Sequence, residues 1–363
     1  MSNTRKCLLV LEATIGGTRR HLRDLALGLS ARGWTLHIVY AARREKDFLR
    51  DISLFREKGI VCTEVDMKRG PAPLSDFAAV LRLRRLIRDF QPDVIHLHST
   101  KAGLLGRLAV GGGNANVIYT PHCFAFEMES PLRKLYFLME KALVPLTDTL
   151  IAVCHDEAAA AARLGYPAKR IRCIHNGLDA GKRIPASSQK KNYDICFAGR
   201  ACRQKGLDLL AEAYRKLLQI RPGTTLVVMS DVQGRTRNEL EKLGVKMLPF
   251  GTTDDTLALL RQSIILVMPS RWEAFPYTPL EAFSAGVPVV AFDVGGVREA
   301  VRDRENGLLV AKGDVDALAA AMREILADPP LLARLARGAA TSAAVFPLPQ
   351  MLDETERLYL AGK

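Results

Sequence analysis

The sequence predicts an α/β protein made of two doubly wound domains, each with a mostly parallel sheet. Short apolar runs alternate with amphipathic helical stretches through most of the 363 residues. Runs this apolar are typical of parallel strands that helices cover on both faces. The length suits two domains of roughly 150–180 residues. Aromatic residues make up only 6 % of the chain, and this balance favours α/β packing over an all-β sandwich.

The N-terminal domain is predicted to span residues 1–180. Its expected strands are Cys7–Leu11, Thr35–Tyr40, Val61–Val65, Asp93–Leu97, Asn116–Tyr119, Thr149–Val153 and Arg172–Ile174. Helical periodicity fills most of the gaps, for example at Arg19–Ala31, Phe77–Asp89 and Pro131–Leu143. Strands that alternate with helices in this way predict consecutive βαβ units.

The polar stretch Gly181–Asn192 has no period and contains Pro185, so we interpret residues 181–192 as an interdomain linker. The C-terminal domain is predicted over residues 193–346. Its expected strands are Asp194–Ala198, Thr225–Met229, Lys246–Leu248, Ile264–Met268, Val287–Ala291 and Gly307–Val310. Its expected helices are Leu207–Gln219, Asp254–Arg261, Leu280–Ala285, Val315–Ala327 and Leu331–Ala344. A last helix near Met351–Leu360, within residues 347–363, is expected to pack back toward the N-terminal domain.

The net charge of +13 is uneven, because residues 1–180 hold 27 Lys and Arg against 18 Asp and Glu. A basic half indicates an anionic partner, which is a nucleic acid, an acidic membrane or a phosphorylated substrate. The cations are scattered among helices without a nucleic-acid motif, so we expect no nucleic acid. The seven cysteines form no C-x-x-C pair, which favours reduced thiols in a cytoplasmic protein. We find neither a signal peptide nor an apolar run of about 18 residues, so any membrane contact is expected to be peripheral.

Ligands of doubly wound sheets bind at the carboxyl ends of the strands, so the strand-to-helix junctions are the candidate sites. After the first strand, Gly16 and Gly17 would let a ligand approach the backbone, although a plain tight turn is the alternative. The pattern is not G-x-G-x-x-G, which speaks against a dehydrogenase. His122 follows the strand that ends at Tyr119 and can face a cleft, although a structural histidine is the alternative.

In the C-terminal half, Arg200, Arg203 and Lys205 follow a turn at Gly199 and can clamp a phosphate, with a solvated charge cluster as the alternative. Glu273 and Glu281 flank a proline-rich turn that opens a helix. A carboxylate there can hold a ribose diol.

The amides near Tyr277 and Thr278 would be helix-start donors for a phosphate, and the alternative is glutamates that favour the helix dipole. The turn at Gly295-Gly296 can be structural or functional.

Together these segments resemble the retaining family 4 glycosyltransferases, which have the GT-B fold of two Rossmann-like domains facing across a cleft. Residues 270–289 (SRWEAFPYTPLEAFSAGVPV) resemble their E-x7-E region, and Gly199-Arg200…Lys205-Gly206 their phosphate segment. Gly16-Gly17 and residues 174–179 (IHNGLD) are similar to their glycine loop and to the end of their N-terminal domain.

The resemblance implies a role for each matching residue. Glu281 would hold the donor ribose, Arg200 and Lys205 the diphosphate, and the amides of Tyr277 and Thr278 the distal phosphate. The segment at Phe275 would approach the sugar and Glu273 would lie near it.

His122 matches the active-site histidine of the family. Gly16 and Gly17 match the loop facing phosphate and acceptor, and Lys101 is assigned an acceptor role, with a solvated lysine as the alternative.

We therefore expect hexosyl transfer with retention from a nucleotide sugar, with UDP first and GDP as the alternative. The expected acceptor is a glycan or a polyprenyl-linked sugar in cell-surface polysaccharide synthesis, such as lipopolysaccharide or exopolysaccharide. No metal or cofactor is expected, because protein cations would take the charge of the leaving group. The helices at Phe77–Phe90 and Leu132–Leu138 mix cations with apolar residues and can lie on an anionic membrane, or be ordinary solvated faces. Alternatives are a sugar-nucleotide 2-epimerase of the same fold and an inactive nucleotide-sugar-binding protein.

Overall fold

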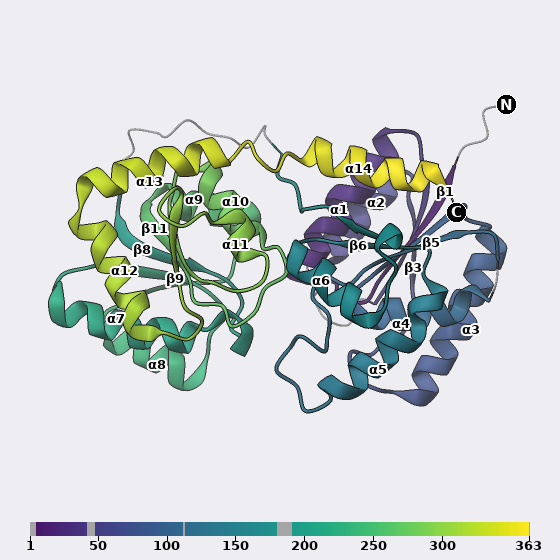
Figure 1. The fold of residues 1–363 in the computed structure, drawn as a ribbon, viewed down its shortest axis with the longest axis horizontal. Helices are drawn as coiled ribbons and strands as arrows, with labels where there is room; N and C mark the ends of the chain where they lie inside the picture. Colours follow the sequence, from purple (N-terminus) through teal and green to yellow (C-terminus); the bar gives the residue numbers. More distant parts are fainter. Residues whose placement is uncertain (1–4, 42–47, 112, 180–190, 363) are drawn as a thin grey trace. The chain divides into compact units, whose positions relative to one another are not determined.

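The structure is a computed structural model that describes residues 5–41, 48–111, 113–179 and 191–362. It divides into two compact units, which Figure 1 shows. Unit 1 comprises Met1–Asn176 with Pro349–Lys363, and unit 2 comprises Gly177–Leu348. Of the predicted linker at 181–192, residues 181–190 lie outside the described part of the chain.

Unit 1 is built on a seven-stranded parallel sheet with the order β3-β2-β1-β4-β5-β6-β7. The strands are β1 (Lys6–Leu11), β2 (Thr35–Tyr40), β3 (Val61–Glu64), β4 (Val94–His98), β5 (Asn116–Thr120), β6 (Thr149–Ala152) and β7 (Ile171–Cys173). Every residue of β4 and β5 is buried, because helices cover both faces of the sheet. All seven strands lie where the apolar runs predict them.

The helices of unit 1 cover the two faces of this sheet. They are α1 (Gly16–Ala31), α2 (Phe48–Glu57), α3 (Pro73–Phe90), α4 (Thr100–Val110), α5 (Arg133–Leu143), α6 (His155–Leu164) and α14 (Leu348–Ala361). Helices α1, α2 and α14 lie on one face, and α3, α4 and α5 lie on the other (Figure 1). Two short 3-10 helices, η2 (Val144–Leu146) and η3 (Ala168–Arg170), join these elements.

Helix α14 carries the end of the chain onto unit 1. Arg32 donates to Glu356 and Asp353 at 2.6 Å each, and the Trp34 indole donates to Glu356 at 2.8 Å. Gly28 leaves room for Leu352, since a Cβ there would lie 2.5 Å from the Leu352 side chain. Through these contacts the last helix packs on unit 1.

Unit 2 repeats the architecture with a six-stranded parallel sheet in the order β10-β9-β8-β11-β12-β13. The strands are β8 (Tyr193–Ala198), β9 (Leu226–Met229), β10 (Lys246–Leu248), β11 (Ser263–Met268), β12 (Val289–Phe292) and β13 (Gly307–Val310). The helices are α7 (Leu207–Ile220), α8 (Gly234–Lys242), α9 (Thr253–Arg261), α10 (Tyr277–Ser284), α11 (Val297–Ala300), α12 (Val315–Ala327) and α13 (Pro329–Ser342).

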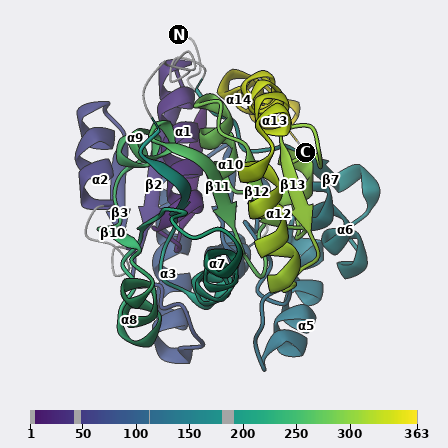
Figure 2. The same ribbon diagram turned by 90° about the vertical axis from the view of Figure 1, so that its left-hand side faces the viewer.

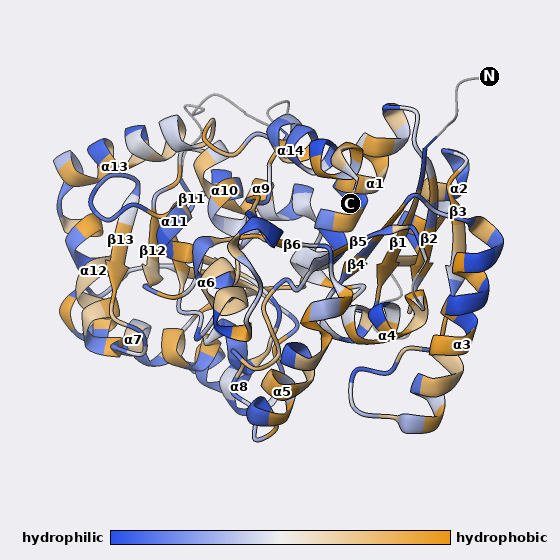
Figure 3. Ribbon diagram, turned by 45° about the vertical axis from the view of Figure 1, so that its right-hand side comes forward, coloured by the Kyte–Doolittle hydropathy of each residue, from blue (hydrophilic) through white to orange (hydrophobic). Residues whose placement is uncertain are grey.

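Helices α7, α8 and α12 cover one face of this sheet, while α9, α10 and α13 cover the other, as Figures 1 and 2 both show. The strands are largely orange in the hydropathy colouring and the helices are striped orange and blue, as expected for helices with one buried face (Figure 3).

Both sheets reverse their strand order next to the first strand, between β1 and β4 in unit 1 and between β8 and β11 in unit 2. Doubly wound folds bind ligands in the crevice that such a reversal opens at the carboxyl ends of the strands. The candidate ligand-binding loops are therefore the four that follow β1, β4, β8 and β11.

Helix α10 begins at Tyr277, three residues before the predicted start at Leu280. The prediction was late because Pro279 follows Tyr277 and Thr278 in the first turn. A proline is compatible with this turn, since its missing N–H has no intrahelical acceptor there. Among the described residues, none of the helices combines the length and the apolar character needed to cross a bilayer.

Candidate functional site

The two loops at the strand reversal of unit 2 are joined by several contacts. The first contains the turn η5 (Arg203–Lys205) after β8, and the second follows β11. The Arg271 amide donates to the Gln204 carbonyl at 2.7 Å, and the Arg271 guanidinium forms two hydrogen bonds to the Asp208 carboxylate at 2.9 and 2.6 Å. Because these contacts join the second loop to the first loop and to the start of α7, they hold residues 200–205 beside residues 270–276.

Lys205 and Glu273 meet between these loops. The Lys205 ammonium lies 2.6 Å from one Glu273 oxygen, and the Gln204 amide donates to the other at 3.3 Å. The side chains of Lys205 and Glu273 are only 17 % and 7 % exposed. The sequence predicts both as site residues, and the structure brings them together across 68 positions of the chain.

Two glycines make this arrangement possible. Gly206 and Gly295 both have positive φ, at +65° and +46°. A Cβ at Gly206 would lie 1.9 Å from the Pro269 carbonyl oxygen, and a Cβ at Gly295 would lie 1.9 Å from that of Glu273. Only glycine allows both the conformation and the close approach. The turn at Gly295 therefore has a structural reason, which is to support the Glu273 backbone.

The start of α10 contributes the remaining residues of unit 2. Tyr277 and Thr278 occupy its first two positions, where N–H groups have no acceptor within a helix. Glu281 lies in the second turn and is buried. The Phe275 side chain is buried against Phe346, with ring centroids 4.9 Å apart, so only its backbone can contribute to a site.

Arg200 is half-buried and forms no ion pair within the described part of the chain. Its neighbour Ala201 donates its amide to Asp231, which follows β9, at 2.7 Å. Through this hydrogen bond, the turn at Met229-Ser230-Asp231 holds the loop that carries Arg200.

The triplet Asp314-Val315-Asp316 has a spacing that can hold a divalent cation. Asp314 instead caps α12 by accepting from the Ala317 amide at 2.8 Å, and Asp316 pairs with Lys216.

In unit 1 the carboxyl ends of β4 and β5 lie beside the start of α1, and four imidazoles form a cluster there. Nδ1 of His98 lies 3.2 Å from Nε2 of His122, and the His21 ring contacts the His122 ring edge-on at 4.7 Å. The His96 ring lies against the His98 ring at a tilt of 39°, with centroids 3.9 Å apart, and its nitrogens form hydrogen bonds with Tyr359 and Thr120. Because a ring nitrogen of each lies within 4.8 Å of the others, His21, His98 and His122 could also hold a metal ion.

The backbone of these loops is strained. Ser99, His122 and Cys123 have positive φ of 77°, 54° and 85°, which non-glycine residues rarely adopt. Such outliers concentrate at functional sites, where the surrounding structure stabilises them. The strain therefore marks the carboxyl ends of β4 and β5 independently of any residue pattern.

Burial keeps these imidazoles neutral. It lowers the pKa of His21 to about 4, against the hydrogen bond to Asn176, and lowers the pKa values of His96, His98 and His122 well below their ordinary range. Nε2 of His98 is buried without a partner among the described residues. A buried N–H without an acceptor costs more free energy than a buried lone pair without a donor. We therefore infer that His98 carries its proton on Nδ1 and donates a hydrogen bond from there to Nε2 of His122. His122 then carries its own proton on Nδ1.

Gly16 and Gly17 begin the 16-residue helix α1, and Gly16 has a φ of +61°. Both are exposed, so an anion can approach the helix start. Lys101 is not the solvated lysine of the alternative interpretation. Its ammonium is buried and donates to Asp76 at 2.6 Å and to the Gly70 carbonyl at 2.9 Å, and both contacts lie near the start of α3.

Sequence reasoning missed His21, His98 and Gln204. His21 is a single histidine within a helical pattern, and His98 ends a strand that also contains His96, so neither residue was assigned a role of its own. A search for polar residues at the carboxyl end of each strand would have found His98, because its strand neighbours the first strand.

Comparison with known proteins places the chain in a family. The model of Glycosyltransferase Family 4 matches residues 15–182, and that of Glycosyl transferases group 1 matches residues 182–342. The D-inositol 3-phosphate glycosyltransferase of Acidothermus cellulolyticus is 30 % identical over 91 % of this chain and 82 % of its own length.

The UDP-Gal:α-D-GlcNAc-diphosphoundecaprenol α-1,3-galactosyltransferase of Escherichia coli is 27 % identical over 72 % of this chain and 73 % of its own. Among solved structures, Anabaena HepE in complex with UDP and glucose superposes with a TM-score of 0.82 at 21 % identity, over 98 % of this chain and all of the other. That likeness concerns the fold alone.

Proposed function

Because this chain belongs to the family 4 glycosyltransferases and has the GT-B fold, we propose that it moves a hexose from a UDP-sugar to a lipid-linked glycan with retention of configuration. The proposed setting is cell-surface polysaccharide synthesis. The observation that carries the proposal is the pair of loops at the strand reversal of unit 2, where Lys205, Arg200 and the start of α10 follow the carboxyl ends of β8 and β11.

We assign the donor diphosphate to this region. Arg200 offers a planar fork of donors, Lys205 a point charge, and the first N–H groups of α10 point toward an anion at the helix start. Charge builds on the diphosphate as the sugar bond breaks, and donors held in place by the loop contacts stabilise it without reorganising. On this assignment the transfer needs no metal ion. Glu281 would take the ribose hydroxyls, Glu273 would lie near the sugar, and Gly16 and Gly17 would face phosphate and acceptor.

We assign His122 to the reaction centre. Its neutral, Nδ1-protonated form can donate a hydrogen bond to a sugar hydroxyl. Nδ1 of His98 holds the His122 ring by its hydrogen bond to Nε2 of His122. Attack by the acceptor on the same face as the departing phosphate would retain the configuration, with that phosphate taking the acceptor proton. Lys101 would act on the acceptor only indirectly, by holding the segment that it ties to Asp76.

Two names among the relatives support the donor and the acceptor. The Escherichia coli relative uses UDP-Gal and a diphosphoundecaprenol acceptor by its name, and the HepE structure contains UDP and glucose. GDP remains the alternative base.

A binding screen tests the donor. Thermal unfolding with UDP, GDP and their sugars is expected to show the largest rise with UDP compounds, since a ligand at 100 times its Kd stabilises by about 2.7 kcal/mol. No rise with any nucleotide would refute the assignment.

Product analysis then separates enzyme classes. Incubation with donor alone reveals an epimerase, addition of a polyprenyl diphosphate sugar reveals a transferase, and NMR of the linkage reports retention. Binding without turnover in either mixture would favour the inactive binding protein.

The acceptor proposal also needs a membrane surface, and unit 1 offers one on the α3 and α5 side. Leu74, Phe77 and Leu81 are 90 %, 66 % and 48 % exposed and lie at spacings of three and four along α3. Exposed Arg82, Arg85 and Arg88 follow in the same helix.

Helix α5 adds exposed Leu135 and Leu138 beside Arg133, Lys134 and Lys141. Apolar residues beside cations suit the boundary of an anionic bilayer, where each cation contributes about 1 kcal/mol.

Flotation with phosphatidylglycerol vesicles tests this surface. We expect binding that weakens in Phe77→Ser with Leu138→Ser, and no effect of Ile220→Ser, which removes an exposed apolar residue from unit 2. Equal flotation of all three proteins, or none with anionic vesicles, would contradict the membrane proposal while leaving donor binding unaffected.

A further inference from the structure

A second group of polar side chains lies at the carboxyl ends of β6 and β7, apart from the residues assigned above. Ala152, the last residue of β6, pairs with Cys173, the last residue of β7. His155 follows Ala152 by three positions as the first residue of α6, and His175 follows Cys173 by two. The parallel register of the two strands therefore brings two imidazoles and one thiol to one end of the sheet.

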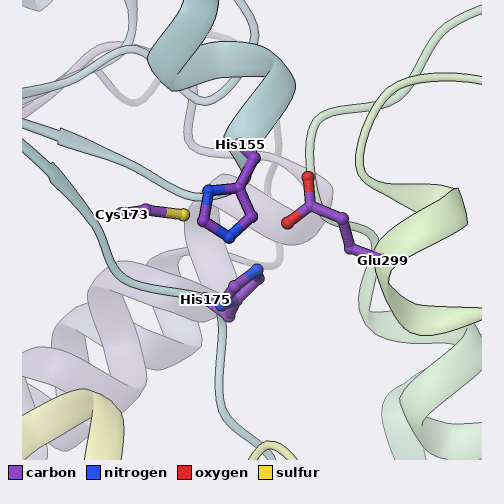
Figure 4. A group of neighbouring side chains, drawn as sticks. All are labelled: His155, Cys173, His175 and Glu299. Carbon is purple, nitrogen blue, oxygen red and sulfur yellow. The ribbon is translucent and has the colours of Figure 1, made fainter.

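Figure 4 shows these three side chains pointing toward one another. Their candidate ligand atoms all lie within 4.8 Å of one another, and the two imidazole rings meet edge-on at 5.7 Å. The figure also labels Glu299, which belongs to unit 2 and is not part of this three-residue group. Ligand atoms of a tetrahedral zinc site with bonds of about 2.0–2.3 Å lie roughly 3.3–3.7 Å apart. The present spacing requires only small side-chain movements, and His155 is exposed and can make them.

We propose that His155, Cys173 and His175 bind a zinc ion. Two imidazoles and one thiolate are the borderline-soft donors that zinc prefers to magnesium or calcium. Three protein ligands would leave a fourth position for water. This site takes no part in the proposed sugar transfer.

The position suggests what a bound ion would do. Residues 175–176 are the last of the first stretch of unit 1, directly before the chain enters unit 2 at Gly177. The Ile174 amide donates to the Ala152 carbonyl at 2.8 Å, after which residue 175 leaves the sheet. A zinc ion would tie this departing segment to the start of α6 and would stabilise the edge of unit 1 by binding only its folded form.

Cobalt substitution tests the site in the full chain, prepared without an affinity tag, reduced and free of metal. Cobalt in a tetrahedral site with a thiolate ligand gives a charge-transfer band in the near ultraviolet, and Cys173 is the only thiolate of the proposed site. We expect the band at one equivalent of cobalt and its loss on adding zinc.

Variants locate the ion. Cys173→Ser should abolish the band, and His155→Ala or His175→Ala should weaken zinc binding, measured against a chromogenic chelator, by more than the roughly 10–100-fold that loss of an outer-shell partner costs. Cys62→Ser, which removes a half-buried thiol on β3, and His122→Gln, which disrupts the imidazole cluster of unit 1, should keep both band and affinity. Zinc should raise the unfolding temperature of the wild type and of these two controls, but not of Cys173→Ser.

Several results would overturn the proposal. One is the absence of a thiolate band in the wild type, and another is unchanged zinc affinity in Cys173→Ser. Loss of binding in His122→Gln, with retention in Cys173→Ser, would instead assign the metal to His21, His98 and His122. None of these results depends on catalysis, so they stay distinct from any failure of the proposed transferase activity.

Discussion

Replacing Lys205 with alanine separates two roles that its position predicts. One is to hold Glu273, and the other is to stabilise the departing diphosphate. The Lys205 ammonium lies 2.6 Å from Glu273, whose side chain is only 7 % exposed. Without Lys205, this carboxylate keeps the weaker Gln204 contact at 3.3 Å. Removing one partner of a fully buried pair costs about 3–5 kcal/mol. We expect roughly 2–3 kcal/mol in the free energy of unfolding, since Lys205 retains some exposure and water can reach the site.

The loss of activity should exceed what the loss of stability explains. If Lys205 also stabilises the departing diphosphate, its removal costs about 2–4 kcal/mol of transition-state stabilisation, or roughly a 30- to 1,000-fold fall in kcat/KM. Isothermal titration isolates this part. Lys205→Ala should weaken the binding of UDP and leave that of uridine, which has no phosphate, unchanged.

The matched control is Lys216→Ala, which removes a half-buried lysine of the same unit that pairs with Asp316. It should behave as the wild type in both assays. The functional role is refuted if Lys205→Ala weakens UDP and uridine equally, or if it turns over at the wild-type kcat/KM. In either case the lysine would serve only to hold Glu273.

Three further predictions address the neighbouring features. Arg200→Ala should lower kcat/KM by about 2–4 kcal/mol with little change in the urea midpoint, since Arg200 forms no ion pair among the described residues; a lowered midpoint with unchanged kcat/KM would contradict this. Gly295→Ala should lower both the unfolding temperature and UDP affinity, because its Cβ would lie 1.9 Å from the Glu273 carbonyl oxygen, whereas Gly313→Ala, which also has positive φ but an open surrounding, should lower the unfolding temperature alone. Acid should destabilise the fold between pH 6.5 and 4, because His21 is protonated near pH 6.5 in the unfolded chain and only near pH 4 in the folded chain, which lowers the free energy of unfolding by about 3 kcal/mol. Urea unfolding at several pH values should show a shallower pH dependence in His21→Gln than in the wild type. An identical slope in the two proteins would disprove the linkage.

The sequence by itself determined the order of strands and helices, and it indicated the loops in which a site was predicted. Strands buried on both faces are continuous apolar runs, so segments such as Asn116–Thr120 and Ser263–Met268 can be read directly from composition. Glu273, Lys205 and His122 could be predicted as candidates because they follow such runs, and strand ends are where doubly wound folds bind ligands. Boundaries were less certain, as α10 shows, because the first turn of a helix accepts a proline that periodicity interprets as a break.

Only the tertiary structure decided which of these residues meet. The contact of Lys205 with Glu273, the burial of Lys101 beside Asp76 and the convergence of His21, His98 and His122 join positions separated by 24 to 101 residues. Cys173 is a further example. Composition interprets it as a reduced structural thiol, whereas the register of β6 and β7 places it beside two histidines. The physical reason is that a local pattern encodes which face of an element is buried, whereas a side-chain contact depends on sheet order and register, which arise from packing between elements distant in the chain.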